Sequence, residues 1–570
     1  MAPTVAAVTT ARINPELLSG LSVSSLSRAG VIVMLILIVL AGFCFRAYRL
    51  NAEGLSEDEL NKVRAVAEYR AHGLTSANGE HPFLMKGLIT LSVVAADYWN
   101  ASAPARRNTE FQLSTETAVR VPSVVFGAFT SLLLFMVLSQ LFGVEVALIA
   151  AALWALDPQA IGFNRIAKED SFFLFFFLLA NVFWLRGQRA AEAGHRNPEA
   201  YYWLTAVVFG AMIASKYLPY VIFISGSYYY IFLDIPTTRW RVGKKRWLIF
   251  FAIMGVAFLV LNPTIFLPET WREVRIFARE QRIGHDGYEF MGEIYRNQLT
   301  LWLSGSPWYF YFVFIGVKLT LPVVVAFIVG LPALFLRRLG DGRFFVLFWL
   351  FFWFFPFTVM GGKFTRYFTF ALPIVLTVAA IGIHTAAGFL SRLLARAPVN
   401  RTPEIYLRAG LVIAALAGSA IASASVAPYY RPYVNAIGGG SEQAGNYFPH
   451  DEFYDARVRE TAATVVAAAR PAAIVASETP ELFSYYARLA GRTDLVSVSL
   501  SDRQALSRLA VGDYIIDARG RRYFSNDTLL KKIRTVSRPA AVVSLGQIPS
   551  TCVYVLDEES HTALAGIVAQ

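Results

Sequence analysis

Charged residues are scarce in this chain of 570 residues, because Asp, Glu, Lys and Arg together make up only 16% of it. Soluble domains contain about 25% charged residues. Hydrophobic residues make up 56% of the chain, and the mean hydropathy is +0.47. This composition excludes an intrinsically disordered chain and a collagen-like repeat. It indicates an integral membrane protein with one soluble part, in which 45 Phe, 26 Tyr and 11 Trp suit lipid contact and interfacial belts.

Cysteine is also rare, since Cys44 and Cys552 are the only two, which is too few for a disulfide framework. The sequence lacks a Walker A loop, a GxGxxG after a strand and a GxSxG elbow, so ATP-driven transport has no support. It also lacks HExxH and paired-cysteine spacings, and His285-Asp286 is better explained by a polar loop than by a metal site. No cofactor is predicted, and dependence on a divalent metal stays open.

Apolar segments long enough to cross a membrane occur along most of the chain. Residues 1–29 are polar and weakly basic, and no A-x-A site follows the first apolar run. We therefore expect a cytoplasmic N-terminal segment and an uncleaved first transmembrane helix. The pattern predicts a mainly α, polytopic bundle of about eleven helices. The predicted spans are 30–45, 120–142, 144–161, 171–186, 201–215, 217–234, 247–267, 307–336, 344–361, 366–390 and 408–427.

The net charge of +12 indicates membrane topology and not nucleic acid, because surplus Lys and Arg usually lie in cytoplasmic loops. Four basic clusters fall on one side of the predicted bundle, within 186–196, 239–246, 337–343 and 392–408. We therefore expect a multi-pass protein of the plasma or inner membrane with a cytoplasmic N-terminus. The outward side then carries loops 46–119 and 268–306 and the tail from about 428.

The tail differs from the rest, because its apolar runs shorten to the length of strands from about residue 440. Runs at 473–477, 495–500, 513–517 and 541–545 read as strands, and those at 480–489, 502–509 and 526–535 read as helices. This alternation predicts a small α/β domain over 440–570. An odd number of spans after a cytoplasmic N-terminus places this domain on the extracytoplasmic side. It follows a transmembrane region over 30–435. Acceptor capture and folding support are both open as its role.

The first outer loop opens with Ser56-Glu57-Asp58-Glu59, in which Ser56 and Glu59 have the spacing of a capping box. The cap does not need Asp58, which lies just beyond the outer end of the first span. There an aqueous active site could meet lipid, although a solvated first turn of a helix explains the residue as well. Similarly, His81 and Lys86 at the start of an apolar helix could hold a phosphate, or Lys86 could be an interfacial lysine.

A dense charge cluster, Arg165-Ile166-Ala167-Lys168-Glu169-Asp170, precedes the span at 171–186. Such density is unusual at 16% charge, although a helix dipole alone could explain Asp170. Lys216 and Arg366 also flank outer helix ends, against the positive-inside bias. An anionic lipid phosphate is a natural partner for cations there, and interfacial anchoring beside tyrosine is the alternative.

In this order, the motifs resemble those of the polytopic GT-C glycosyltransferases that use polyprenyl-phosphate sugars. Protein O-mannosyltransferases and their bacterial relatives, including the lipid A aminoarabinose transferase, are the most similar group. The resemblance covers roughly residues 30–435, and Phe83 departs from it by replacing a second Pro of the His-Pro-Pro-Leu-x-Lys stretch. The matched motifs are Asp58-Glu59, His81-Pro82-Phe83-Leu84-Met85-Lys86, Arg120-Val121-Pro122, Arg165 with Asp170, Lys216-Tyr217 and Arg366-Tyr367.

The resemblance implies transfer of a sugar from a polyprenyl-phosphate donor, within the membrane, to an extracytoplasmic protein, lipid or cell-envelope glycan. Asp58 is then expected as the general base and Asp170 as a second acid that orients the acceptor or a metal. The substrate-binding residues would be Glu59, His81, Lys86, Arg165, Lys216 and Arg366, with the four cations on the leaving phosphate. Direct displacement would invert the anomeric centre.

Two alternatives come from other classes of protein. A transporter or flippase of a lipid-linked glycan would also need outward cations, but ionisable residues should then lie along the middle of its helices. The predicted helix centres are almost free of them. An inactive scaffold whose tail binds a partner would have no need for Asp58.

Overall fold

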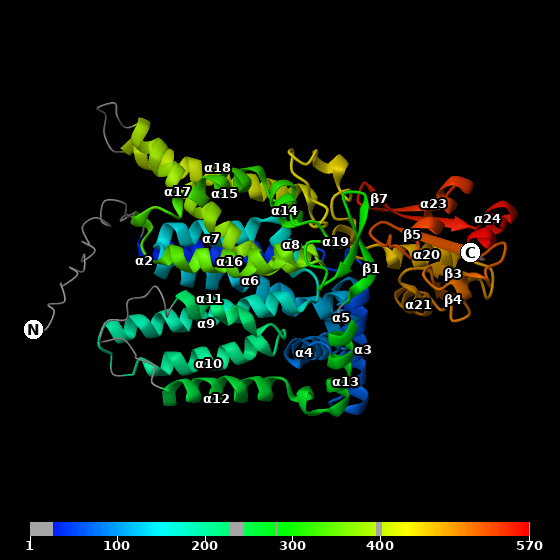
Figure 1. Cartoon of the computed structure of the whole chain (residues 1–570), viewed down its shortest axis with the longest axis horizontal. Coiled ribbons are helices and arrows are strands. Elements are labelled where there is room, and N and C mark those ends of the chain that lie inside the picture. The colour runs from blue at the N-terminus through cyan, green and yellow to red at the C-terminus, as the bar shows by residue number, and fades with distance from the viewer. Residues whose placement is uncertain (1–26, 196, 229–243, 281, 395–401, 569–570) are drawn as a thin grey trace, which may run out of the picture.

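The computed structural model describes residues 27–195, 197–228, 244–280, 282–394 and 402–568. Helices that run roughly parallel form a bundle, and a mixed β-sheet lies beyond one end of it (Figure 1). The predicted cytoplasmic segment 1–29 falls almost entirely outside the described residues. The expected mainly helical membrane fold with a small C-terminal α/β region is confirmed.

Six helices in the described part of the chain are long and apolar enough to cross a membrane. Three shorter apolar helices pack with them in the same bundle. The six are α2 (Arg28–Ala47), α6 (Thr115–Leu141), α9 (Glu169–Glu192), α16 (Gly342–Val359), α17 (Leu372–Leu394) and α18 (Thr402–Val426). The three are α10 (Glu199–Ile213), α12 (Lys244–Leu261) and α15 (Leu321–Ala333).

Two predicted spans are broken. The span at 144–161 consists of α7 (Val144–Leu156) and α8 (Pro158–Asn164), which meet at an angle of 62°. Asp157 causes the break, because its carboxylate caps α8 by accepting from the N–H groups of Gln159 and Ala160 at 3.0 and 2.9 Å. The span at 307–336 divides into α14 (Phe310–Lys318) and α15, and that at 217–234 is described only up to Tyr228, with α11 at Ile222–Ser227.

The end of the bundle next to the C-terminal sheet is called the outer end from here on, after the side that the sequence predicts for it. It carries short helices and a hairpin. Among them, α3 (Glu57–His72) and α13 (Pro268–Glu280) run across the direction of the bundle helices (Figure 1). The others are α4 (Phe83–Asn100), α5 (Ala103–Arg107) and the antiparallel strands β1 (Arg282–Phe290) and β2 (Glu293–Gln298). The α9–α10 connection lies at the opposite end of the bundle (Figure 1).

The C-terminal sheet has the strand order β4-β3-β5-β7-β6. Strands β4, β3 and β5 are parallel, and β7 and β6 are antiparallel to their neighbours. The four expected strands are present as β3 (Ile474–Ser477), β4 (Val496–Ser499), β5 (Tyr514–Ala518) and β6 (Ala541–Leu545), whereas β7 (Ile548–Val555) was not expected. The helices of this region are α19 (Pro449–Phe453), α20 (Val458–Ala468), α21 (Pro480–Leu489), α22 (Arg503–Leu506), α23 (Asp527–Val536) and α24 (Glu558–Val568).

One hydrophobic cluster joins the outer helices to the C-terminal sheet. It includes Leu60 of α3 and Met85 of α4, and it continues into Leu482 and Phe483 of α21 and Tyr514 of β5. All five side chains are buried. Because the apolar contacts run across this junction, the C-terminal region is packed on the outer end of the bundle and not tethered loosely.

Candidate active site

The capping box at the start of α3 sets the direction of the outer acidic residues. The Oγ of Ser56 accepts from the N–H of Glu59 at 3.3 Å, and the Glu59 carboxylate accepts from the N–H of Ser56 at 3.0 Å. This confirms the predicted capping box. Asp58 therefore lies in the first helical turn, facing the end of the bundle.

Asp58 has one bound and one open carboxylate oxygen. Lys168 forms an ion pair with Oδ2, and the hydroxyl of Tyr454 donates to the same oxygen. Among the described residues, no hydrogen bond reaches Oδ1, and 32% of the side chain is exposed. Burial raises the pKa of Asp58, but the charges of Lys168, Arg366 and Lys62 outweigh it and hold this pKa well below its usual range.

The first turn of α9 supplies two further ion pairs. Glu169 lies 3.1 Å from the ammonium of Lys62 and 3.6 Å from Nδ1 of His81. Asp170 accepts from the ammonium of Lys216 at 2.5 Å. Burial lowers the pKa of His81 to about 4, although the neighbouring Glu169 carboxylate opposes this shift, so the imidazole is neutral at pH 7.

Arg366 lies among aromatic rings at the same end. Its guanidinium is over the rings of Tyr367 and Tyr454, at 5.8 and 5.6 Å from their centroids, and Nη1 lies 3.7 Å from Oδ1 of Asp451. The ammonium of Lys216 lies 5.2 Å from the centroid of Tyr367. About 16% of the Arg366 side chain and 24% of the Lys216 side chain are exposed. Lys216 and Arg366, which are far apart in the sequence, therefore both lie over the ring of Tyr367.

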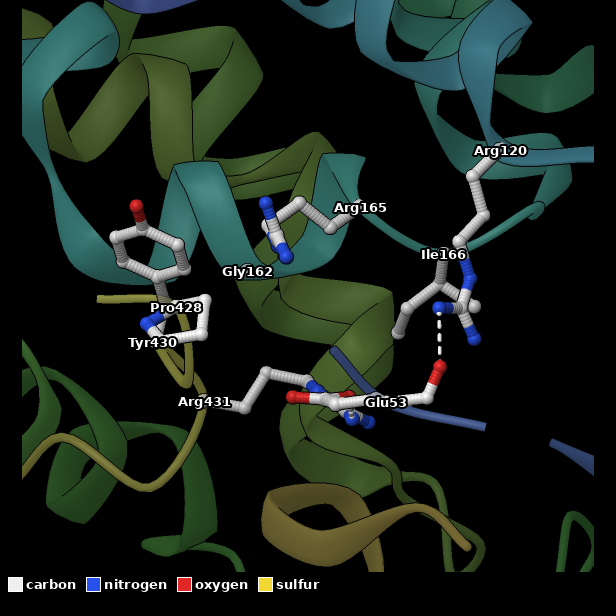
Figure 2. A pocket seen from close by; sticks show the side chains of 8 residues that line it. All are labelled: Glu53, Arg120, Gly162, Arg165, Ile166, Pro428, Tyr430 and Arg431. Carbon is white, nitrogen blue, oxygen red and sulfur yellow. Dashed lines mark hydrogen bonds and ion pairs between the residues drawn. The ribbon is translucent and has the colours of Figure 1, made fainter. Parts of the chain in front are cut away.

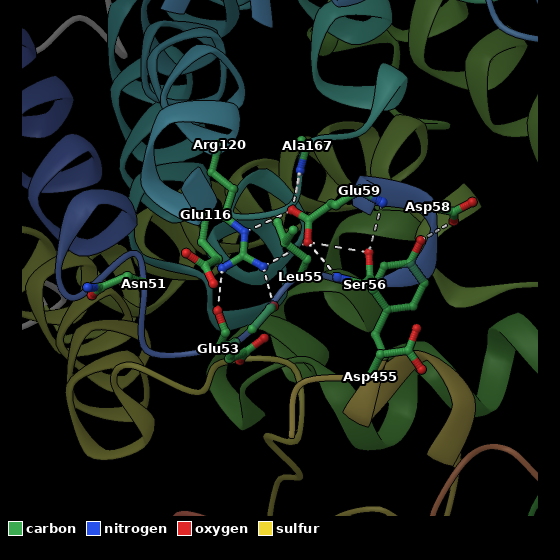
Figure 3. Close-up of polar contacts among 12 residues, drawn as sticks. Asn51, Glu53, Leu55, Ser56, Asp58, Glu59, Glu116, Arg120, Ala167 and Asp455 are labelled. Atoms are coloured by element: carbon green, nitrogen blue, oxygen red, sulfur yellow. Dashed lines mark hydrogen bonds and ion pairs between the residues drawn. The ribbon is translucent and has the colours of Figure 1, made fainter. Parts of the chain in front are cut away.

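Glu59 pairs with Arg120, the arginine of the Arg-x-Pro motif (Figure 3). Nε and Nη2 of Arg120 donate to the two oxygens of Glu59 at 2.8 and 2.7 Å, and the carboxylate also accepts from the N–H of Ala167 at 3.0 Å. The remaining donors of Arg120 reach loop carbonyls at 2.6–3.0 Å, namely those of Leu50, Glu53 and Gly54. Both side chains are buried, and the Glu59 carboxylate is held by contacts within the protein.

Arg165 binds the end of α2. Its guanidinium donates to the carbonyls of Arg46, Tyr48 and Arg49 at 2.8, 2.7 and 2.9 Å, where a helix has no partners of its own. A small pocket lies beside it (Figure 2). Its charged lining consists of Arg120, Arg165, Arg431 and Glu53.

Lys86 is fully buried at the start of α4. Its ammonium donates to the carbonyls of Ala77 and Asn78 at 3.0 and 2.6 Å and so holds the loop ahead of His81. Burial lowers the pKa of Lys86 to about 8, although Glu80 opposes the shift. The structure therefore brings His81, Lys216 and Arg366 to the end of the bundle that carries Asp58 and Asp170. Glu59 binds Arg120, while Lys86 and Arg165 face backbone carbonyls.

The segment around α19 also contributes to the site, which no motif in the sequence predicts. Asp451 accepts from the hydroxyl of Tyr288 at 2.6 Å, and Asp455 accepts from the N–H of Glu57 at 3.1 Å. Tyr454 and Asp455 both have left-handed backbones, with φ of 43° and 63°, and each such residue costs about 1–3 kcal/mol. The density of acidic residues in 450–455 is the one sequence signal that could have pointed to this segment.

His285 and Asp286 make polar contacts with the C-terminal region. The His285 ring stacks on Tyr523 at 4.1 Å, and its Nε2 accepts from Arg521 at 2.9 Å. Asp286 accepts from the N–H of Ser525 at 3.0 Å. Within the described ranges, no group of three or more His, Cys, Asp or Glu side chains is placed to hold a metal ion.

Part of the chain that carries this site is similar to a known protein family. A family model described as dolichyl-phosphate-mannose-protein mannosyltransferase matches residues 109–266, a segment that includes Arg120, Arg165, Asp170 and Lys216. None of the curated proteins matches the chain.

Two solved structures with a similar fold are distant in sequence. The apo oligosaccharyltransferase of Archaeoglobus fulgidus is 11% identical with a TM-score of 0.51, covering 86% of this chain and 70% of its own. ArnT from Cupriavidus metallidurans bound to undecaprenyl phosphate is 13% identical with a TM-score of 0.45, covering 92% and 98%. The first likeness shows a shared fold. Residues 109–266 are, in addition, similar to the family of dolichyl-phosphate-mannose-protein mannosyltransferases.

Proposed function

We propose that the protein transfers a sugar from a polyprenyl phosphate to an acceptor on the side of the membrane that carries the C-terminal sheet, with Asp58 as the general base. The observation that carries this proposal is the asymmetry of the Asp58 carboxylate. Two donors, Lys168 and Tyr454, hold Oδ2, while Oδ1 is open next to a group of cations. A base needs one oxygen fixed and the other within reach of the proton that it takes.

The reaction is a direct displacement with inversion. A hydroxyl or amine of the acceptor attacks the anomeric carbon, its proton passes to Oδ1 of Asp58, and the bond from the sugar to the phosphate oxygen breaks. The polyprenyl phosphate leaves with the bonding electrons as a stable anion, so no strong general acid is needed. A glycosidase, in contrast, needs a second carboxyl group to protonate its leaving group.

Three cations are placed to bind the leaving phosphate, namely Lys168, Lys216 and Arg366. Their side chains are 8%, 24% and 16% exposed, respectively, and Lys168 and Lys216 pair with Asp58 and Asp170. Asp170 positions Lys216 through their 2.5 Å contact. Because backbone carbonyls already take their donors, Lys86 and Arg165 act on the phosphate by charge at longer range.

Donor binding also adjusts the base. In the free protein the neighbouring cations hold the pKa of Asp58 low, which makes it a weak base. A phosphate that binds Lys168 and Arg366 adds negative charge nearby and raises the pKa of Asp58 towards the range that proton transfer requires. The carboxylate therefore becomes a better base when the donor is present.

The test is a transfer assay with purified protein and labelled polyprenyl-phosphate hexose or pentose, scored on membrane fractions. Asp58→Asn should abolish transfer while leaving expression and membrane insertion unchanged. Asp97→Asn is the matched control, because Asp97 pairs with Arg70 on an exposed surface. Full turnover by Asp58→Asn would contradict the assignment. Movement of label across vesicles without a new glycosidic bond would favour the transporter or flippase alternative.

A further inference from the structure

Among the described residues of the C-terminal region, Tyr454 is the one whose side chain forms a hydrogen bond with the proposed base, Asp58. We propose that Tyr454 is a positioning residue of the transfer reaction, because its hydroxyl fixes Oδ2 of Asp58 so that Oδ1 faces the acceptor. The C-terminal region is then a part of the active site and not an appended domain. This inference rests on the proposed role of Asp58 as the base.

The surroundings of Tyr454 leave its ring little freedom. The side chain is 6% exposed, and the guanidinium groups of Arg366 and Arg431 lie 5.6 and 5.4 Å from the ring centroid. Arg431 is itself held by an ion pair with Glu53 and by the carbonyl of Phe453 at 3.4 Å. Because the ring is fixed on a cationic surface, the hydroxyl points at the carboxylate of Asp58 without a search through rotamers.

The backbone around Tyr454 is tied to the same helix as Asp58. Asp455 accepts from the N–H of Glu57 at 3.1 Å and forms an ion pair with Arg521, whose Nε lies 2.7 Å from it. Tyr454 and Asp455 adopt left-handed backbones that non-glycine residues rarely keep unless their surroundings enforce them. Two consecutive residues of one segment therefore bind the first turn of α3, one to the backbone and one to the base.

The hydrogen bond has a chemical consequence besides its geometric one. A hydroxyl that donates to a carboxylate stabilises the charged form, so Tyr454 lowers the proton affinity of Asp58. The other charged groups that face Asp58 are Glu57, Lys62, Lys168 and Arg366. Replacing Tyr454 by Phe removes the donor and leaves all these charges in place.

The test compares Tyr454→Phe with Tyr447→Phe across a pH series of kcat. Tyr447 is the matched control, because its hydroxyl donates to the carbonyl of Gly438 at 3.0 Å in the same segment. Tyr454→Phe should lower kcat with little change in KM for the donor. The acidic limb of the pH profile of kcat should also move to higher pH by about one unit. This is the size expected for one hydrogen bond to a charged group. Tyr447→Phe should leave the limb in place.

A second variant, expected to shift the pH profile in the opposite direction, distinguishes a loss of the hydrogen bond from a loss of folding. 3-Fluorotyrosine at position 454 is a stronger donor of the same shape, so it should move the acidic limb to lower pH. If both Tyr454 variants have the kcat and the acidic limb of the wild-type protein while Asp58→Asn is inactive, the inference is overturned and the proposed function stands. If Asp58→Asn is active, the proposed function itself fails.

Discussion

The buried pair of Arg120 and Glu59 gives the sharpest test of how the site is held together. Their side chains are 5% and 1% exposed, and Arg120 also donates to three loop carbonyls. Arg120→Met would leave a buried carboxylate without its counter-ion, which costs about 3–5 kcal/mol. Glu59 directly follows Asp58, so the same change should also disturb the base and reduce transfer.

A double-mutant cycle separates the pair from its surroundings. Arg120→Met, Glu59→Gln and the double variant are compared by equilibrium unfolding in mixed detergents. Because the glutamine carries no charge, the double variant should be more stable than the sum of the single losses predicts, by about 1–3 kcal/mol. If the losses simply add, Arg120 and Glu59 are not energetically coupled and the reasoning fails.

Two further predictions concern charge in the same region. Burial lowers the pKa of His81 to about 4, from about 6.5 in an unfolded chain, so protonation opposes folding. The thermal midpoint should therefore fall as the pH drops from about 6.5 to 4, and this dependence should weaken in His81→Asn; an unchanged slope would contradict it. Lys216→Gln should reduce kcat/KM about 10²-fold and weaken inhibition by free polyprenyl phosphate, whereas equal inhibition of both proteins would exclude Lys216 from the phosphate site.

Most of the fold could be predicted from the sequence, because apolar length and strand-sized runs are local signals. Helix α21 begins and ends where 480–489 was expected, and the four expected strands are present. The predicted span at 144–161 is broken because Asp157 and Pro158 start a new helix inside it. Strand β7 was missed, since it follows β6 through a tight hairpin at Gly546 and its Pro549 obscured the strand pattern.

The site was harder to predict than the fold, because its contacts join residues far apart in the chain. Arg366 and Lys216 lie at the same end of the bundle as Asp58, yet its direct partners Lys168 and Tyr454 follow it by 110 and 396 positions. Composition cannot show which lysine of a charged loop faces a carboxylate and which faces a carbonyl. Lys86 illustrates this, because its motif resembles a phosphate contact while its ammonium binds the carbonyls of Ala77 and Asn78.

The ion pairs at the outer end of the bundle have a consequence for turnover. Lys168 and Lys216 each already have a carboxylate partner, Asp58 and Asp170 respectively. In the proposed reaction, the donor phosphate therefore shares these lysines with their carboxylates, which lowers its affinity. After transfer, the same carboxylates compete with the spent polyprenyl phosphate for the lysines. In the proposed reaction, the internal counter-ions thus limit inhibition by the spent lipid carrier and favour its return to the membrane.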